Sequence, residues 1–326
     1  ADKRVAVIGT GASAIQFVPE VRREARELLV FQRSAPFVFP KLDREYLPQH
    51  QRTFRAFPVI QLAGRLGLWL FGEIATIGLL GNKPIAKLIE WITLTHLKKK
   101  VRDKRLRDKL TPDYQVGCKR VLFSNNYYDA MVQPNVELVT ERISEIAPNG
   151  VRTVDGVEHK VDALILGTGF TATEFLAPMK VRGLGGRDLG EVWHEGARAY
   201  LGMTVPDFPN MFLMYGPNTN LGANSIIYML ERQARYTVQA VRTLAGRPGR
   251  YLNVRSDVER RFDDEMQRRL RRSMWTLCHS WYRNSNGRVT TNWPGLVSEY
   301  DRRTRKLDLT DYRITTAPGA AEQPAA

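Results

Sequence analysis

Residues 4–33, RVAVIGTGASAIQFVPEVRREARELLVFQR, decide the fold of this chain. Residues 4–8 form a short apolar run rich in β-branched side chains, which is typical of a buried strand. After a glycine turn, residues 12–26 carry apolar side chains at helical spacing, and residues 28–31 form a second apolar run. Strand, turn, helix and strand make a βαβ unit. Parallel strands joined by a crossover helix predict a doubly wound α/β sheet.

The turn between the first strand and the helix is a G-x-G-x-x-A motif. Its members are Gly9, Thr10, Gly11, Ala12, Ser13 and Ala14. Gly9 permits the tight turn, Gly11 lets a pyrophosphate approach the backbone, and Ala14 lets the helix pack closely on the strand. The helix N-terminus adds unpaired N–H groups and a positive dipole end. The motif therefore predicts dinucleotide binding; the alternative is a glycine-rich turn without a ligand.

The end of the second strand indicates which dinucleotide is bound. An NAD or FAD site normally has Asp or Glu there, bonded to the ribose 2′-hydroxyl. This chain has Gln32, Arg33 and Ser34 instead. A guanidinium group suits a 2′-phosphate through charge-assisted hydrogen bonds, so we expect NADPH rather than NADH. The alternative is a surface arginine that binds nothing.

The rest of the chain alternates between helical and strand signals. Residues 36–111 hold few strand signals and contain helix-like stretches, among them 66–80 and 83–107. Strand signals then return at 121–123, 136–139, 163–166 and 211–215. Two amphipathic helices follow, the second over 257–275 with Ser256 and Glu259 at capping-box spacing. We expect two domains.

The segment 66–80 is apolar apart from Glu73. It is too short to span a bilayer, which needs about 20 apolar residues. We expect a helix of an insertion packed on the core. Contact with a membrane surface is the less favoured alternative.

The composition is that of a soluble globular protein with a strong basic excess. Lys and Arg number 49 against 34 for Asp and Glu, a net charge of +15. Much of the excess lies in 98–107 and 260–272 at helical spacing, which predicts solvated helix faces. No nucleic-acid-binding motif accompanies the charge, so we expect no nucleic-acid partner. The two cysteines and five histidines have no metal-ligand spacing; we expect no metal and a reducing, cytoplasmic setting.

Residues 3–40 resemble the NADPH-binding repeat of class B flavoprotein monooxygenases and, within that class, are similar to Baeyer–Villiger monooxygenases. The resemblance continues through 110–130, 163–170, 200–220 and Ser280-Trp281-Tyr282. It implies three regions: a doubly wound (Rossmann-like) NADPH-binding domain over 1–120 with a helical insert at about 41–111, the C-terminal part of a FAD-binding domain over 121–316, and a disordered tail over 317–326.

The resemblance also implies roles for individual residues. Arg120 matches the family's active-site arginine, which stabilises a negatively charged peroxyflavin; the alternative is a solvated arginine at a strand end. Lys119 matches a contact to the NADP 2′-phosphate, beside Arg33, and Trp281 matches a contact to the nicotinamide nucleotide. The full set of implied cofactor-binding residues is Gly9, Thr10, Gly11, Ala12, Ser13, Ala14, Gln16, Arg33, Ser34, Lys119, Gly167, Thr168, Gly169, Asn218 and Trp281.

The implied activity is that of an NADPH- and FAD-dependent monooxygenase. It would insert one atom of O2 into a ketone through a flavin C4a-peroxide, giving an ester or lactone. The family's FAD fingerprint and its F-x-G-x-x-x-H-x-x-x-W stretch do not occur in the sequence. We therefore expect the N-terminal FAD-binding segment to be missing, with activity of this chain alone left open. The alternatives are a heteroatom-oxidising flavin monooxygenase and an inert NADP-binding fragment.

Overall fold

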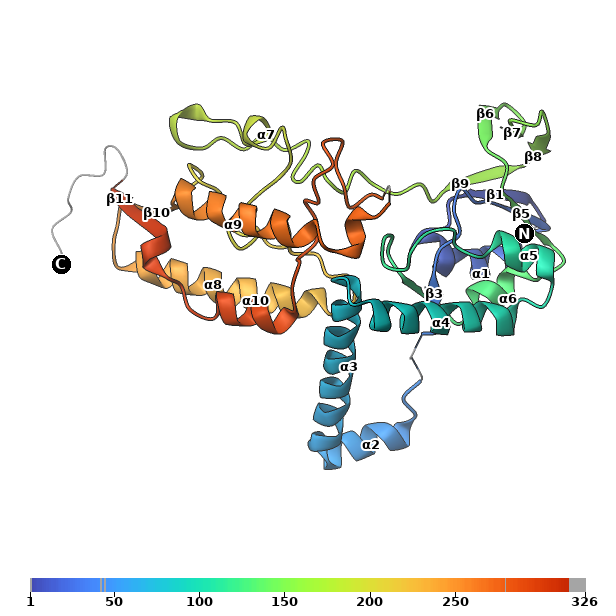
Figure 1. Ribbon diagram of the computed structural model, residues 1–326, viewed down its shortest axis with the longest axis horizontal. Helices are drawn as coiled ribbons and strands as arrows, with labels where there is room; N and C mark the ends of the chain where they lie inside the picture. The colour runs from blue at the N-terminus through green and yellow to red at the C-terminus, as the bar shows by residue number, and fades with distance from the viewer. Residues whose placement is uncertain (1, 42, 44, 279, 317–326) are drawn as a thin grey trace. The chain divides into compact units, whose positions relative to one another are not determined.

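A four-stranded parallel sheet carries the first of two units in the computed structural model (Figure 1). Its order is β5-β2-β1-β9, with bounds β1 Arg4–Ile8, β2 Glu27–Phe31, β5 Val136–Val139 and β9 Ala163–Leu166. Helix α1 (Ala14–Glu24) connects β1 to β2, which pair in parallel. The predicted βαβ unit and the doubly wound α/β class are confirmed. The structure describes residues 2–41, 43, 45–278 and 280–316, so the expected disordered tail at 317–326 lies outside the described residues.

Apolar side chains cover both faces of this sheet. On one face Val7 and Val30 pack with Val18 of α1 and with Tyr127 of α6 (Tyr127–Met131). On the other face Leu29 packs with its own set of buried side chains. That set includes Val151 of β7, from an antiparallel sheet of β6 (Ile143–Ala147), β7 (Gly150–Thr153) and β8 (Glu158–Lys160). Burial on both faces explains why the parallel strands read as continuous apolar runs.

The first unit comprises Ala1–Thr53 and Pro84–Phe170, and the second comprises Phe54–Lys83 and Thr171–Ala326. This division differs from the expected boundary near residue 120. The reason is strand pairing: β5 pairs with β2 and β9 pairs with β1, so both strands complete the sheet that the N-terminal βαβ unit begins. The short parallel pair β3 (Val38–Phe39) and β4 (Leu122–Phe123) also lies in the first unit.

Among the described residues of 41–111, the stretch expected as a helical insert of the first domain forms four helices, and its part Phe54–Lys83 belongs to the second unit. They are α2 (Pro48–Ala56), α3 (Pro58–Leu79), α4 (Lys83–Lys100) and α5 (Lys104–Lys109). The stretch expected as one helix over 83–107 breaks before α5, where the Asp103 carboxylate accepts hydrogen bonds from the N–H groups of Arg105 and Leu106. Helix α3 is longer than expected, and most of its apolar side chains are exposed. The expectation that 66–80 packs on the core is therefore wrong for all but the C-terminal turns of α3.

The second unit is mainly helical. Its longer elements are α8 (Ile226–Ala245), α9 (Ser256–Leu270), α10 (Val297–Thr304) and an antiparallel pair of β10 (Arg250–Val254) with β11 (Tyr312–Thr316). The short helix α7 is Leu189–Val192. These elements enclose an apolar core that includes Met229, Met266 and Trp293.

Two sequence predictions in the second unit are wrong. Residues 211–215 form no strand: Leu213 donates a backbone hydrogen bond to Met203, and Tyr215 has a positive φ of 60°, which a strand cannot accommodate. The capping box also does not form, because α9 starts at Ser256 with Arg255 as N-cap and without a side-chain cap. Glu259 instead lies buried, with Oε1 3.4 Å from Nε of Arg198.

Candidate functional site

The ends of β1 and β9 meet at two glycines. Gly9 has a φ of +111°, and a Cβ atom there would lie 2.4 Å from the carbonyl oxygen of Gly167. A Cβ atom on Gly167 would lie 3.2 Å from the Ile8 oxygen and 3.6 Å from the Cβ of Ala14. The small residue at position 14 thus lets α1 approach β9 closely. Protein packing therefore explains Gly9, Ala14 and Gly167 without any ligand.

Gly11 differs from these glycines. A Cβ atom at Gly11 would have no heavy atom within 4 Å, and its φ does not require glycine. The residue is exposed, as is Ser13. Nothing in the described protein fills this space, so the missing side chain leaves room for a ligand to approach the backbone. This is the position at which the motif expects a pyrophosphate.

The N-terminus of α1 lies beside this open space. Its N-cap, Ser13, makes no side-chain capping hydrogen bond, and the first turn holds no acidic residue. Within the described residues, the N–H groups of Ala12 and Ser13 have no acceptor. Gln16 points back to the turn, with Nε2 donating to the Ala12 oxygen at 2.7 Å. Two N–H donors and an uncompensated helix dipole therefore remain for an anion.

Three predicted residues from distant parts of the sequence meet at Ser34. The Lys119 ammonium donates to Oγ of Ser34 at 2.9 Å, and Oγ1 of Thr10 donates to the Ser34 oxygen at 3.2 Å. The ammonium also lies 4.4 Å from the centre of the Tyr114 ring. Tyr114 in turn packs edge-on against Phe37, with ring centres 5.4 Å apart. These contacts hold the Lys119 cation next to the glycine turn.

The charges around Lys119 favour an anion. Burial lowers the pKa of the Lys119 ammonium; Asp113 opposes this shift, and the positive charge of Arg33 adds to it. Arg33 therefore lies close enough to Lys119 for the two cations to repel each other. A bound phosphate would remove this repulsion. Burial also raises the pKa of Tyr114 to about 12, so its ring stays neutral beside the ammonium at ordinary pH.

Arg120, next in sequence, is in a different position. It is exposed, and among the described residues it makes no hydrogen bond or ion pair. The turn before these two cations contains Gly117, with a φ of +87°, and the buried Cys118. The guanidinium of Arg120 is thus available to a ligand, whereas the Lys119 ammonium is held at Ser34.

Thr168 and Gly169 follow Gly167 at the end of β9. Both are exposed, and Gly169 has a φ of +91°. The turn therefore offers an open backbone after a glycine that packing already requires. It lies at the same sheet edge as Gly9, so β1 and β9 present their turns together.

Two predicted site residues, Asn218 and Trp281, belong to the second unit. Asn218 is buried, and its Nδ2 donates to the carbonyl oxygens of Val289 and Asn292, both at 3.0 Å. Its amide hydrogens thus hold two chain segments together. Trp281 is 43% exposed, and its ring lies against Tyr282 with centres 4.2 Å apart. An exposed indole on a buried support can stack on a planar ligand.

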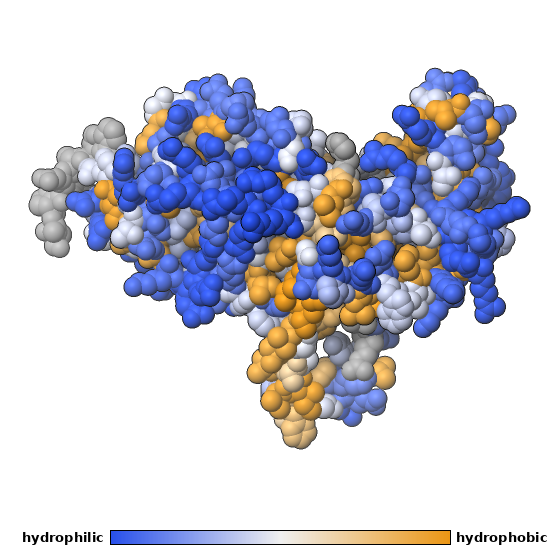
Figure 2. Space-filling view, in the orientation of Figure 1, coloured by the Kyte–Doolittle hydropathy of each residue, from blue (hydrophilic) through white to orange (hydrophobic). Residues whose placement is uncertain are grey.

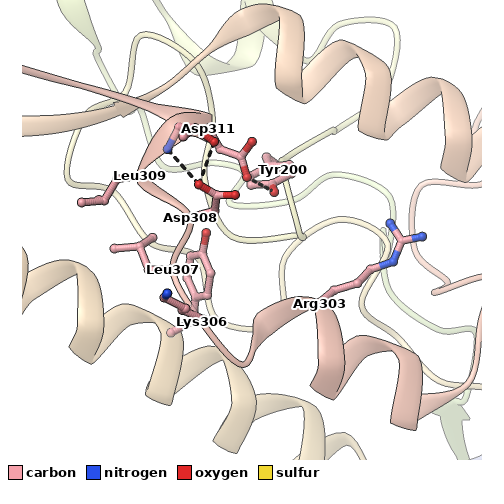
Figure 3. Close-up of a pocket in the computed structure, with 9 residues that line it drawn as sticks. Tyr200, Arg303, Lys306, Leu307, Asp308, Leu309 and Asp311 are labelled. Atoms are coloured by element: carbon pink, nitrogen blue, oxygen red, sulfur yellow. Dashed lines mark hydrogen bonds between the residues drawn. The ribbon is translucent and has the colours of Figure 1, made fainter.

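The second unit also has a hollow of about 560 Å³, shown in Figure 3. Its lining includes Tyr200, whose hydroxyl donates to the Asp311 carboxylate at 2.5 Å, and the polar ends of Lys306 and Asp308. None of the predicted site residues lines this hollow.

The sequence also did not indicate Tyr114, because an aromatic ring under a lysine leaves no periodic or motif signal.

The chain is similar to curated monooxygenases over nearly all of its length. It is 42% identical to a Baeyer–Villiger monooxygenase of Pseudomonas aeruginosa, over 98% of this chain and 61% of that protein. It is 38% identical to a Baeyer–Villiger monooxygenase of Streptomyces coelicolor, over 96% of this chain and 61% of that protein. It is 37% identical to FAD-binding monooxygenase ktnD of Aspergillus niger, over 98% of this chain and 54% of that protein. A comparison with protein-family models found no match.

Solved structures agree with these relatives. An oxidised steroid monooxygenase bound to NADP is 26% identical, with a TM-score of 0.82 over 97% of this chain and 67% of that one. OTEMO in complex with FAD and NADP is 25% identical, with a TM-score of 0.82 over 96% and 66%. Cyclohexanone monooxygenase, 20% identical with a TM-score of 0.80 over 97% and 68%, shares the fold. The resemblance seen in the sequence is confirmed: the chain belongs to the Baeyer–Villiger monooxygenase family, and it spans about three fifths of the length of the first curated relatives it matches.

Proposed function

We propose that this chain is the NADPH-binding and catalytic part of a flavin-dependent Baeyer–Villiger monooxygenase. The complete enzyme would use NADPH, FAD and O2 to convert a ketone into an ester or lactone. The observation that carries the proposal is the Lys119–Ser34 hydrogen bond of 2.9 Å beside an open glycine turn. It supports the proposal because it fixes a cation beside the turn that would bind NADPH, within reach of a 2′-phosphate.

The residues present fit NADP. The exposed backbone at Gly11 and the N–H groups of Ala12 and Ser13 would hold the pyrophosphate. Lys119 and Arg33 would hold the 2′-phosphate, and their mutual repulsion in the protein alone would end when it binds. Among the described residues, Arg33 is exposed and Lys119 is held by Ser34, and neither cation forms an ion pair with an acidic side chain.

The residues fit FAD in part. In the first unit, Thr168 and Gly169 are exposed and would contact the flavin nucleotide; in the second unit, the Trp281 ring is exposed and would contact the nicotinamide nucleotide. Residues 9–14, which the NADP pyrophosphate would occupy, lead into α1, whereas the second G-x-G-x-x-A at residues 167–172 is followed by turns and not by a helix, so it lacks the helix N-terminus that a FAD pyrophosphate needs. Asn218 would act as a positioning residue, because its side-chain N–H groups bond the protein. Bound FAD would provide the group that takes up the hydride of NADPH and then reacts with O2.

Arg120 would act on the reacting atoms. Its guanidinium is exposed and without a protein partner in the described chain, so it can stabilise negative charge that develops on oxygen. Its planar donors would hold that oxygen in a defined orientation. The identity of the ketone is set by side chains that these motifs do not include.

The test is product analysis with the full-length enzyme, NADPH and a panel of ketones, amines and sulfides. Ester or lactone formation from ketones supports the proposal. Oxidation of amines or sulfides alone would make the protein a heteroatom-oxidising flavin monooxygenase, and NADP binding without turnover would make it an inert binding protein.

A cytoplasmic location stays a prediction, and since neither cysteine is a free thiol in the structure, the cysteines do not support it.

A further inference from the structure

Helix α3 exposes a continuous apolar stripe. Its members are Val59, Leu62, Leu66, Leu70, Ile74 and Ile77, which are 37–67% exposed. They recur at intervals of three and four residues, so they lie along one side of the helix. Figure 2 shows hydrophobic residues along this helix, and Figure 1 shows its N-terminal end pointing away from α8 and α10 of the same unit. Isolated exposed leucines are common, but a stripe of this length is not.

The C-terminal turns of α3 explain how the helix is held. Glu73, Thr76 and Leu79 are buried in the second unit, and Leu79 belongs to its main core. Asn224 donates from Nδ2 to Oε1 of Glu73 at 3.1 Å. The C-terminal half of α3 is therefore anchored, whereas residues 58–68 of its N-terminal half are exposed.

The N-terminal half of α3 is apolar on more than one side. Every residue over 58–68 is exposed. Leu68 is 61% exposed and lies nine residues after Val59, about half a turn around the helix from the stripe. A groove in a partner protein covers one side of a helix, whereas the apolar layer of a membrane surrounds it.

The charges next to the stripe are all positive. Arg55, Arg65 and Lys83 are exposed and make no ion pair with any described residue. In the sequence from 46 to 89 the only acid is Glu73, which is buried. The chain as a whole carries a net charge of +15. A second copy of this chain would bring like charges together, whereas an anionic membrane surface would bring opposite charges together.

The length of the exposed part excludes a membrane span. Among the described residues, α3 is the one helix long and apolar enough to cross a bilayer by length and composition. Its anchored half lies in the folded unit, and residues 58–68 would extend about 16 Å at 1.5 Å per residue. The hydrocarbon layer is about 30 Å thick. The helix can therefore enter one leaflet and cannot cross both.

We propose that α3 is a membrane-surface anchor: its N-terminal half lies at the boundary between the headgroups and the hydrocarbon of one leaflet, with its leucines towards the hydrocarbon, and Arg55, Arg65 and Lys83 contact anionic headgroups. This corrects the expectation that the helix packs on the core and takes up the alternative of a membrane contact. The proposal does not depend on the monooxygenase activity.

The test is sedimentation of the full-length protein with vesicles of phosphatidylcholine alone or of phosphatidylcholine with phosphatidylglycerol. We expect the protein to bind the phosphatidylglycerol vesicles and to dissociate as salt rises. A Leu62→Ser/Leu66→Ser/Leu70→Ser variant should bind at least about 100-fold more weakly. An Arg55→Gln/Arg65→Gln/Lys83→Gln variant should lose about 100-fold on anionic vesicles and nothing on neutral ones.

The control is Val238→Ser/Val241→Ser, which removes exposed apolar side chains from α8 of the same unit and should bind as the unchanged protein does. Equal loss in this control would overturn the proposal, as would failure to bind either vesicle. Hydrogen exchange without vesicles gives an independent readout. Slow exchange over 58–68 in the full-length protein would show that another part of the chain, or a second copy, covers α3. That result would also overturn the proposal.

Discussion

Glu73 on α3 caps the N-terminus of α10 through Ser298. Oε2 of Glu73 accepts a hydrogen bond from Oγ of Ser298 at 2.7 Å and from its N–H at 3.3 Å, while Oε1 accepts from the Val297 N–H at 2.9 Å. The cap is supplied from 224 residues away in sequence. A negative charge at a helix N-terminus is stabilising, and here it also fixes α3 to the second unit.

Removing this carboxylate should destabilise the second unit. Glu73→Ala leaves the buried Val297 N–H without an acceptor, and we expect a loss of about 2–4 kcal/mol in the free energy of unfolding. Glu73→Gln keeps one acceptor oxygen and should lose less. Urea denaturation followed by tryptophan fluorescence measures both. Equal stability of Glu73→Ala and the unchanged protein would show that water replaces the cap.

Two glycines of the same motif should respond differently to alanine. Gly9→Ala forces a Cβ to within 2.4 Å of a backbone oxygen at a φ of +111°, so we expect a loss of about 2–4 kcal/mol of stability. Gly11→Ala has open space and should fold normally, yet weaken NADP binding by at least about tenfold, because the Cβ occupies the pyrophosphate position. Thermal unfolding and calorimetric titration separate the effects. Unchanged NADP affinity in Gly11→Ala would remove the ligand from this turn.

Lys119 and Arg33 should decide between NADPH and NADH. Lys119→Ala and Arg33→Ala should each cost about 1.5–3 kcal/mol in NADPH affinity, the value of a charge-assisted hydrogen bond, and leave NADH affinity unchanged. Arg142→Ala, an exposed arginine of the same unit, is the control. Titration of both nucleotides checks this. Lys119 loses its positive charge as pH rises, and the preference for NADPH should be lost with it. Because burial lowers the Lys119 pKa, this loss should begin at a lower pH than it would for an exposed lysine.

Glu259 should make the second unit less stable as pH rises. Burial raises its pKa to about 7; Asp263 adds to this, and Arg198 and Arg288 oppose it. The folded state therefore holds a proton that the unfolded state releases near pH 4.5, so stability present below that value is lost as pH rises towards 7. The total loss is on the order of 3 kcal/mol. Denaturation midpoints across this range should fall in the unchanged protein and stay level in Glu259→Gln.

Local patterns predicted the elements that depend on neighbouring residues. The strands at 4–8 and 28–31 and the helix between them are where periodicity indicated, since burial of successive side chains defines them. The pairing of β9 with β1 joins segments more than 150 residues apart, and no local signal carries it. No local signal carries the hydrogen bond between Lys119 and Ser34 either. The family resemblance implied only that both residues bind the same cofactor.

Exposure was the property least visible in the sequence. Hydropathy showed that 66–80 is apolar, but whether such a helix is buried depends on what lies around it. Glu259 shows the same limit, because its spacing from Ser256 suits a capping box, whereas burial against Arg198 determines its actual contact. The Asn218 amide likewise bonds carbonyl oxygens that follow it by more than 70 residues.

Arg120 should separate the two halves of the proposed reaction. In the full-length enzyme, Arg120→Ala should leave reduction of FAD by NADPH running, because Lys119 and Arg33 would still hold the nucleotide. Ester formation should fall by about 10²–10³, the cost of losing one preorganised donor to a developing negative charge, and O2 should be released as hydrogen peroxide. Arg120→Lys should restore little, since an ammonium lacks the planar donors of a guanidinium. Stopped-flow absorbance follows the reduction, and chromatography with a peroxide assay follows the products. Ester formation by Arg120→Ala at near the unchanged rate would make Arg120 a surface residue without a catalytic role.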